Sequence, residues 1–240
     1  MKIKAFLLCY NEAPLLPFVL QHYSEFCDKI TIYLDDLTTD NSLEIIKQFP
    51  KAEVIGFVGN GLDDRLLRTL KNTIWKGAQC DWVIVADMDE LLYCRNIKQR
   101  LAELQVDGIT IIKPYGFNMI SDTFPQVGQP ITEQITKGIP NEWENKCIIF
   151  NPNKINEINY TLGAHDCQPT GEVKLYRGAD IKLLHYKLLS LDYYKSRRTI
   201  SLSRIPKDFQ DHVSIYDESD EARTKLFNDY LVSAEEIVNV

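Results

Sequence analysis

The chain has 240 residues, of which 45% are hydrophobic and 25% are charged, and its formal net charge at pH 7 is −7. This length and composition are typical of an ordinary globular protein, and we expect a single domain over residues 1–240. The negative charge argues against a dedicated nucleic-acid-binding protein, because no global positive field is present to attract phosphate backbones.

Neither the start of the chain nor its cysteines indicate export or membrane insertion. The apolar run that begins at Ile3 reaches polar Asn11 too soon for a signal peptide, and no apolar stretch approaches the ~20 residues of a membrane span. The six cysteines form no CxxC pair, which favours reduced thiols over a disulfide framework or a zinc site. We therefore expect a cytoplasmic protein.

Strand and helix patterns alternate through the first 115 residues. Apolar or alternating runs predict strands at 3–9, 29–34, 53–58, 82–86 and 108–113. Apolar residues at helical spacing predict helices between them, at about 14–23, 41–49, 63–78 and 97–104. This alternation predicts an α/β fold with a mostly parallel sheet, right-handed crossovers and a nucleotide-binding role for this half.

The second half, 116–240, is less regular. Its first thirty residues carry three prolines and three glycines, which predicts a mostly irregular segment over 115–145. Strands are expected at 146–150, 172–177 and 181–186, and helices at 190–203 and 219–232.

The most informative motif is Asp87-Met88-Asp89-Glu90, which directly follows the apolar strand at 82–86. In open α/β sheets, ligands bind beyond the carboxyl ends of the strands. Carboxylates clustered there need a compensating proton or cation, and Mg2+ or Mn2+ is the simplest. Because alternate strand residues face the same way, Asp87 and Asp89 can converge on one ion while Met88 turns into the core. The alternative is an acidic turn that ends a strand.

Several further motifs lie at predicted strand ends. Two of them follow the first and second predicted strands, and the acidic motif follows the fourth. The further motifs are Tyr10-Asn11-Glu12, Asp35-Asp36 with Thr39-Asp40, and Leu184-His185-Tyr186-Lys187 followed by Ser190 and Tyr193-Tyr194-Lys195. With Asp87–Glu90, they make the chain resemble the glycosyltransferase family 2-like proteins of GT-A fold. The resemblance implies a Rossmann-like sheet, a donor-binding first half and an acceptor-side second half.

The same resemblance implies an activity. The expected reaction moves a sugar from a nucleotide-sugar donor, with UDP favoured, to a hydroxyl of a glycan or lipid-linked acceptor. The expected cofactor is Mn2+ or Mg2+, and the expected setting is surface polysaccharide or glycoconjugate assembly. An enzyme of this kind needs no nucleic acid partner.

Five residues near the first two strand ends are implied to contact the donor. Tyr10 would lie against the base, with Asn11 and Glu12 nearby. Asp36 matches the position that accepts a hydrogen bond from the uracil ring, with Asp35 as the second choice. Two other interpretations stay open, because asparagine commonly caps helices and aspartate commonly forms turns.

The metal and phosphate contacts are implied to come from four residues. Asp89 is the first choice for a direct metal ligand. Asp87 is expected to contact the metal or the donor ribose, and His185 is the candidate for a third metal ligand. Arg68 is the candidate for donor phosphate within the basic set Arg65, Arg68 and Lys71. A packed histidine and a solvated helix face remain the alternative interpretations.

An inverting transferase also needs a base that takes the acceptor proton. Asp166 is our first candidate, with Glu142 and Glu144 behind it, because no acidic pair at a helix start matches the usual family base. A retaining enzyme would not need this base. A basic stretch could hold the protein at the inner face of a membrane, or it could be a solvated helix; its members are Lys195, Arg197, Arg198, Arg204 and Lys207.

Other classes fit less well. A haloacid-dehalogenase-type phosphatase would carry its acidic motif on the first strand, with Thr or Val where Leu91 stands. An EF-hand loop that starts at Asp87 would need glycine at its sixth position, where this chain has Leu92. A nucleotidyltransferase would need a glycine-rich basic loop after the first strand, where Tyr10 to Pro14 provides none. A sugar-nucleotide-binding module without activity stays open as the main alternative, because no clean base is present.

Overall fold

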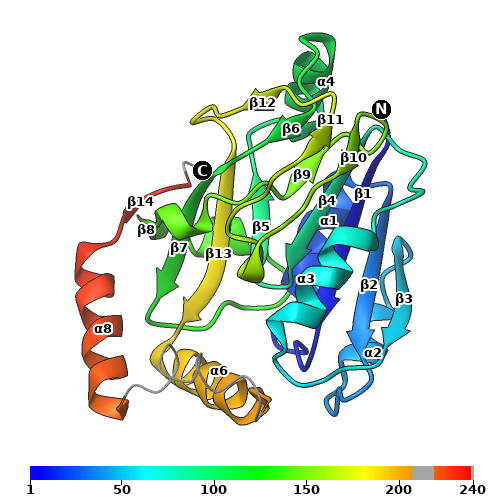
Figure 1. Cartoon of the computed structure of the whole chain (residues 1–240). Coiled ribbons are helices and arrows are strands. Elements are labelled where there is room, and N and C mark those ends of the chain that lie inside the picture. Colours follow the sequence, from blue (N-terminus) through cyan, green and yellow to red (C-terminus); the bar gives the residue numbers. More distant parts are fainter. Residues whose placement is uncertain (207–218, 239–240) are drawn as a thin grey trace.

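The computed structural model describes residues 1–206 and 219–238, which form two main sheets and their surrounding helices (Figure 1). The larger sheet has seven strands in the order β12 (Leu175–Tyr176), β6 (Ile111–Ile112), β9 (Ile149–Phe150), β4 (Trp82–Asp87), β1 (Ile3–Cys9), β2 (Lys29–Asp35) and β3 (Ala52–Phe57). Strands β4, β1, β2 and β3 are mutually parallel, and β9 runs antiparallel between β4 and β6. The predicted α/β class with a mostly parallel sheet is confirmed.

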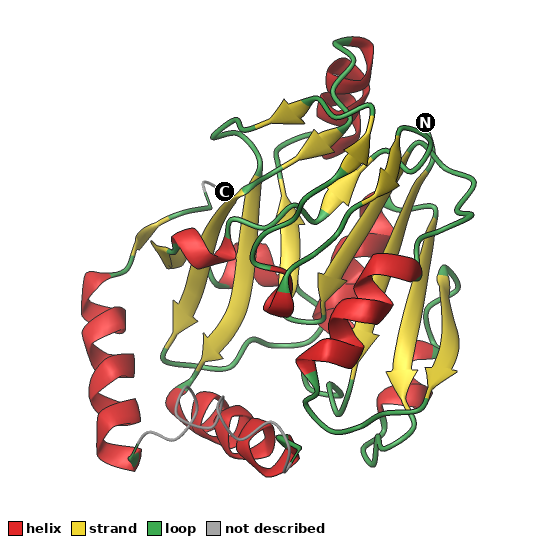
Figure 2. Ribbon diagram, viewed as in Figure 1, coloured by secondary structure: helices red, strands yellow, loops and turns green. Residues whose placement is uncertain are grey.

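The connections place helices on both faces of this sheet. The chain passes from β1 through α1 (Leu16–Phe26) to β2, and through α2 (Ser42–Ile46) to β3, in one direction across the sheet. It then returns through α3 (Asp64–Thr73) to β4 on the other side of β1. Right-handed crossovers in opposite directions put α1 and α3 on opposite faces, and Figure 2 shows helices in front of the sheet and behind it.

Strand β4 is buried on both faces, as its apolar run predicts. Ile84 and Ala86 belong to the core cluster that also contains the apolar side of α1. Val83 and Val85 face the opposite cluster, where Trp75 packs edge-on against Phe150 with ring centroids 4.9 Å apart. The strand therefore holds its carboxyl end rigidly between two packed layers.

The second sheet has five strands in the order β14 (Glu235–Glu236), β8 (Lys137–Pro140), β7 (Tyr115–Ser121), β13 (Lys182–Leu189) and β5 (Glu90–Tyr93). Strand β13 runs parallel to β7 and antiparallel to β5. A short pair, β10 (Ile155–Glu157) and β11 (Thr170–Gly171), lies apart. Because β5 begins three residues after β4 ends, the acidic motif is the point where the chain leaves one sheet and enters the other.

The remaining helices fall mainly in the second half of the chain. They are α4 (Ile97–Val106), α5 (Ile131–Gln134), the 3-10 turns η1 (Glu142–Glu144) and η2 (Leu162–Ala164), α6 (Leu191–Arg204) and α8 (Asp220–Ser233). The helices predicted at 190–203 and 219–232 are confirmed by α6 and α8. Among helices in the described part of the chain, none combines the length and apolar character needed to cross a bilayer.

One prediction of secondary structure is wrong. Residues 115–145, expected to be mostly irregular, contain β7, α5, β8 and η1. Two of its three glycines allow close packing instead of forming loops: a Cβ on Gly138 would lie 2.8 Å from the Asn118 carbonyl oxygen, and one on Gly116 would lie 2.3 Å from the Glu144 backbone. Glycine in a strand often marks such a close approach of another backbone.

Candidate functional site

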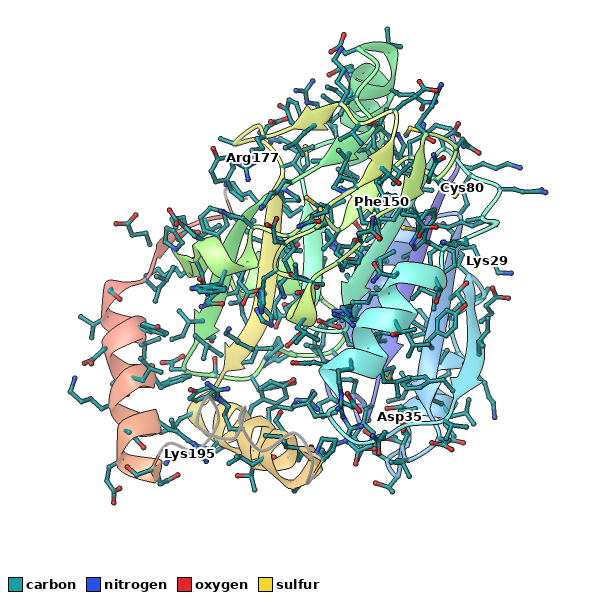
Figure 3. The ribbon with its side chains drawn as sticks, in the orientation of Figure 1. Lys29, Asp35, Cys80, Phe150, Arg177 and Lys195 are labelled. Atoms are coloured by element: carbon teal, nitrogen blue, oxygen red, sulfur yellow. The ribbon has the colours of Figure 1, made fainter. Side chains whose placement is uncertain are left out.

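The carboxyl ends of β1, β2, β4 and β13 lie at one end of the molecule, beside α6 (Figure 1). Figure 3 places Asp35 at the end of β2, near α6. Asp35 and the acidic motif therefore share one region, and the pairing of β13 with β5 brings His185, in the middle of β13, opposite Glu90 of that motif. This is the edge at which open α/β sheets bind ligands.

The four residues of the acidic motif have separate environments. Met88 is buried in the core, as the strand alternation predicted. The Asp87 carboxylate is half-exposed and receives a 2.7 Å ion pair from Lys71 Nζ, and its backbone N–H donates to Glu90 Oε2 at 3.0 Å. Glu90 is 1% exposed and therefore belongs to the buried framework of the site.

Asp89 pairs with His185, which arrives from the other half of the chain. His185 Nε2 lies 3.0 Å from Asp89 Oδ2, and the backbone N–H of Tyr186 donates to the Asp89 carbonyl oxygen at 2.7 Å. Burial opposes the charged imidazole, but the carboxylates of Asp89 and Glu144 outweigh it and raise the pKa of His185 to about 9. Burial likewise opposes the Asp89 carboxylate, yet His185 and other nearby cations hold its pKa below the usual value.

A buried charge network supports this pair from behind. Glu144 Oε1 lies 2.9 Å from His185 Nδ1 and 3.2 Å from Lys187 Nζ. Lys146 Nζ lies 2.5 Å from Glu90 Oε1 and 3.0 Å from Glu144 Oε2. Burial would lower the pKa of Lys146, but the two carboxylates raise it. The network therefore keeps the carboxylates of Glu90 and Glu144 charged although they have almost no contact with solvent.

The turn after β1 is tied to both neighbouring elements. Asn11 has a positive φ of 47°, and its side chain accepts from the Thr39 N–H at 2.8 Å, so it clamps two loops and does not cap α1. Glu12 is buried and forms an ion pair with Arg197 of α6, which also donates to the Asn11 carbonyl oxygen at 3.1 Å. Burial raises the pKa of Glu12 to about 8 against the opposing effect of Arg197.

The end of β2 is closed by the last residue of α6. Asp35 is 2% exposed, and Arg204 Nη2 donates to its Oδ2 at 2.5 Å. The Arg204 guanidinium carbon lies 3.2 Å from the centroid of the Tyr10 ring. Asp36 is exposed and accepts from the Gly59 N–H at 2.9 Å. The first choice for a base contact is therefore open to solvent, and the second is occupied by Arg204.

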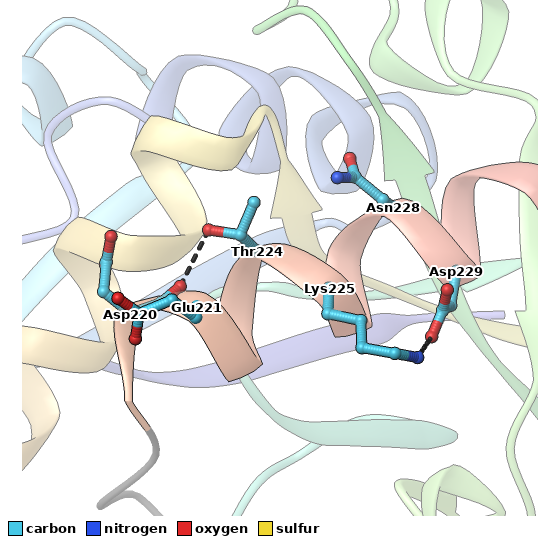
Figure 4. A pocket seen from close by; sticks show the side chains of 6 residues that line it. All are labelled: Asp220, Glu221, Thr224, Lys225, Asn228 and Asp229. Carbon is cyan, nitrogen blue, oxygen red and sulfur yellow. Dashed lines mark hydrogen bonds and ion pairs between the residues drawn. The ribbon is translucent and has the colours of Figure 1, made fainter.

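Within residues 1–206 and 219–238, no hydrogen bond or ion pair joins Arg68, Asp166 or Glu142 to Asp89 or His185. Asp166 is exposed and pairs with Lys113 at 3.4 Å. Figure 4 shows a hollow on α8 that contains none of the predicted site residues.

The basic stretch of α6 is partly used within the protein. Arg197 and Arg204 face the site as described above, and Lys195 pairs with Asp220 of α8 at 2.7 Å. The guanidinium of Arg198 lies over the Tyr194 ring, 5.7 Å from its centroid. Lys207 lies outside the described residues. Membrane contact through this helix stays a prediction.

Sequence reasoning missed the cations that balance the site. Lys146 had no assigned role, Lys71 was considered for donor phosphate or a solvated helix face, and Arg197 and Arg204 were assigned to a basic helix that is either solvated or in contact with a membrane. A signal was present for Lys146, because it opens an otherwise apolar strand run, Cys147 to Phe150, where an unpaired lysine would be costly. No local pattern identifies its other partner, Glu90, which lies 56 residues away in the chain, although Glu144 is only two residues away.

The geometry fits a divalent cation held by two residues. Two neighbouring ligands at about 2.1 Å from an octahedral ion are about 3.0 Å apart, so the hydrogen-bonded Asp89 Oδ2 and His185 Nε2, 3.0 Å apart, are also placed to ligate one ion once the imidazole loses its proton. His185 Nδ1 is buried without a well-formed hydrogen bond among the described residues, and Glu144 is the nearby acceptor that could orient it. In that part of the chain, no three His, Cys, Asp or Glu side chains form a metal-binding group. Mg2+ and Mn2+ sites commonly use one or two carboxylates together with water and substrate phosphate.

Comparisons with known proteins bear on the fold. No family model and no curated protein matches the chain. The crystal structure of S. aureus TarS matches with a TM-score of 0.50 and 14% identity over 96% of this chain and 43% of that chain. TarS 1-349 in complex with UDP-GlcNAc matches with a TM-score of 0.51 and 12% identity over 96% of this chain and 72% of that chain. TarS 1-349 in complex with UDP matches with a TM-score of 0.50 and 13% identity over 96% of this chain and 71% of that chain. The chain thus spans less than half of the first of these TarS chains and shares the fold of the TarS structures.

Proposed function

We propose that this protein transfers a sugar from a nucleotide-sugar donor, with a UDP sugar favoured, to an acceptor hydroxyl on a glycan or lipid-linked molecule. The observation that carries the proposal is the pairing of Asp89 with His185 at the carboxyl end of the sheet. The TarS structures that share this fold contain UDP or UDP-GlcNAc, which supports the choice of donor.

A divalent cation at Asp89 and His185 would neutralise the charge that grows on the nucleoside diphosphate as the glycosidic bond breaks. The chain's own residues prepare that position. Lys71 fixes one oxygen of the half-exposed Asp87, which leaves the other for a donor hydroxyl. We therefore assign Asp87 to the donor ribose and Asp89 to the cation.

Glu144 has a different role from the one its sequence position suggested. Its side chain is buried behind His185 and pairs with Lys146 and Lys187, so it cannot reach an acceptor directly. A carboxylate at histidine Nδ1 fixes the ring and leaves Nε2 free to bind a metal. We therefore assign Glu144 as a positioning residue, and Asp166 keeps the place of first candidate base.

Calorimetry and donor hydrolysis test the proposal together. We expect UDP to bind in the presence of Mn2+ and UDP-GlcNAc to be slowly hydrolysed. Asp89→Asn should abolish both Mn2+-dependent signals, whereas Asp229→Asn, the same substitution on the exposed face of α8, should change neither. If no nucleoside diphosphate binds the wild-type protein with or without Mn2+, the proposal is wrong.

A nucleotide-sugar-binding module without turnover is the second candidate. It is favoured by the position of Asp166, whose side chain is 69% exposed and paired with Lys113 instead of contacting Asp89 or His185. The two candidates differ in one measurement, because only the enzyme hydrolyses the donor or glycosylates an acceptor. Normal turnover by Asp166→Asn would reject the base assignment and leave the transferase proposal intact.

A further inference from the structure

The last turn of α6 lies where the donor base is expected. Arg204 places its planar guanidinium against the Tyr10 ring, with the guanidinium carbon 3.2 Å from the ring centroid. The same group donates to Asp35 Oδ2 at 2.5 Å. A uracil ring would need these same two features, a flat π surface and a carboxylate that accepts from a ring N–H. We propose that Arg204 is a self-occluding latch in the base subsite, which a nucleotide must displace in order to bind.

The contact distances explain why the base and the latch compete. A separation of 3.2 Å is already a van der Waals contact, so no aromatic ring can enter between Arg204 and Tyr10. Asp35 is 2% exposed and its Oδ1 accepts from the Leu37 N–H at 2.9 Å, but Oδ2 would lose its charged partner when Arg204 leaves, which would be costly. A base that donates an N–H to Asp35 compensates for the departure of Arg204. A group without such a donor does not, so the latch also favours nucleotides whose base carries one.

Gly61 and Leu62 hold the latch through one side-chain and one backbone hydrogen bond of Arg204. The Leu62 N–H donates to the Arg204 carbonyl oxygen at 2.7 Å, and Arg204 Nη2 donates to the Gly61 carbonyl oxygen at 3.2 Å. Gly61 has a φ of 67°, and a Cβ there would lie 2.1 Å from the Arg204 carbonyl oxygen. Only glycine therefore permits this contact. Gly61→Ala should push the last turn of α6 away and open the latch while Tyr10, Asp35 and Arg204 keep their own side chains.

The other end of α6 is anchored separately. Its N-terminal Ser190 caps the helix by accepting from the Tyr193 N–H, and Arg197 in the middle of the helix pairs with Glu12. Displacement of Arg204 therefore requires movement of the last turns only. The proposed opening is a local change at one end of a helix that stays attached at the other.

Calorimetric titrations with two probes test the latch, which rests on the proposed nucleotide-sugar function. UDP needs the base subsite, whereas inorganic pyrophosphate with Mn2+ does not. We expect Arg204→Met and Gly61→Ala to bind UDP about tenfold more tightly than wild type, if the latch is closed about 90% of the time. Their affinity for pyrophosphate should be unchanged. Lys195→Met, on the same helix but paired with Asp220, should alter neither affinity.

The opposite results are equally informative. Weaker or unchanged UDP binding by both variants would overturn the latch, and weaker binding by Arg204→Met alone would make Arg204 a nucleotide contact. If wild type and variants bind neither probe, the proposed function fails, and the latch fails with it. Hydrogen exchange provides a second readout: UDP should speed exchange of the Leu62 amide in wild type, and Gly61→Ala should show fast exchange without UDP.

Discussion

The buried Lys146 allows a direct test of how the charges of the site are balanced. Its Nζ lies 2.5 Å from Glu90 Oε1 and 3.0 Å from Glu144 Oε2, and all three side chains are 5% exposed or less. Lys146→Met keeps most of the side-chain volume but leaves both carboxylates without this partner. Removing one partner of a buried pair costs about 3–5 kcal/mol. We expect the free energy of unfolding to fall by that amount, out of a total of about 5–15 kcal/mol.

Urea denaturation followed by circular dichroism measures this change. Lys225→Met is the matched control, because Lys225 forms an exposed pair with Asp229 on α8 and should change the unfolding free energy by about 0.5 kcal/mol or less (Figure 4). Lys146 holds the pKa of Glu90 below its usual value, so without Lys146 burial raises that pKa. The deficit should therefore shrink as pH falls, and Glu90→Gln added to Lys146→Met should recover part of it. A Lys146→Met protein within about 1 kcal/mol of wild type at pH 7 would refute the reasoning.

Three further predictions concern other parts of the structure. Hydrogen bonds from Arg65 lower the pKa of Asp63 to about 2, so its contribution is present at pH 7 and is lost as pH falls toward 2. Asp63→Asn should lower the unfolding free energy by about 1–2 kcal/mol at pH 7, a figure reduced from the full pKa shift because Arg65 is partly exposed to solvent. At pH 2 the loss should be small. An equal loss at both pH values would contradict this. Glu144→Gln should weaken Mn2+ binding about 10–100-fold in calorimetry by loosening His185, and unchanged affinity would remove its positioning role. Gly116→Ala should destabilise the protein by about 1–3 kcal/mol in urea denaturation, because its Cβ would overlap the Glu144 backbone; a neutral result would contradict the close packing.

Local patterns were sufficient to predict the first half of the fold. The continuous apolar run of β4 predicted a strand buried on both faces, and the alternation after it placed Met88 in the core with Asp87 and Asp89 outside it. These signals are local, because the apolar run of a buried strand and the alternation of its side chains both involve consecutive residues. The position of the acidic motif at the sheet edge followed from them.

The partners of those residues could not be predicted in the same way. Residues 115–145 contain strands because Gly116 and Gly138 meet other backbones, which the sequence cannot show before the fold is known. Lys146 and Arg204 each reach a carboxylate that lies far away in the chain, and ion pairs of this kind leave no periodic signal. Membership of the site was predictable for residues at strand ends, but the cations that neutralise them depend on tertiary packing.

The pairing of β13 with β5 has a consequence for biosynthesis. It sets His185 opposite Glu90 and joins residues 96 positions apart through Asp89. Closing such a long segment of chain is slow compared with forming local helices and turns. During synthesis on the ribosome, the growing polypeptide therefore carries its aspartates long before the imidazole emerges. The two-residue centre can form only after about three quarters of the 240 residues have been translated, so a product terminated before His185 would lack it.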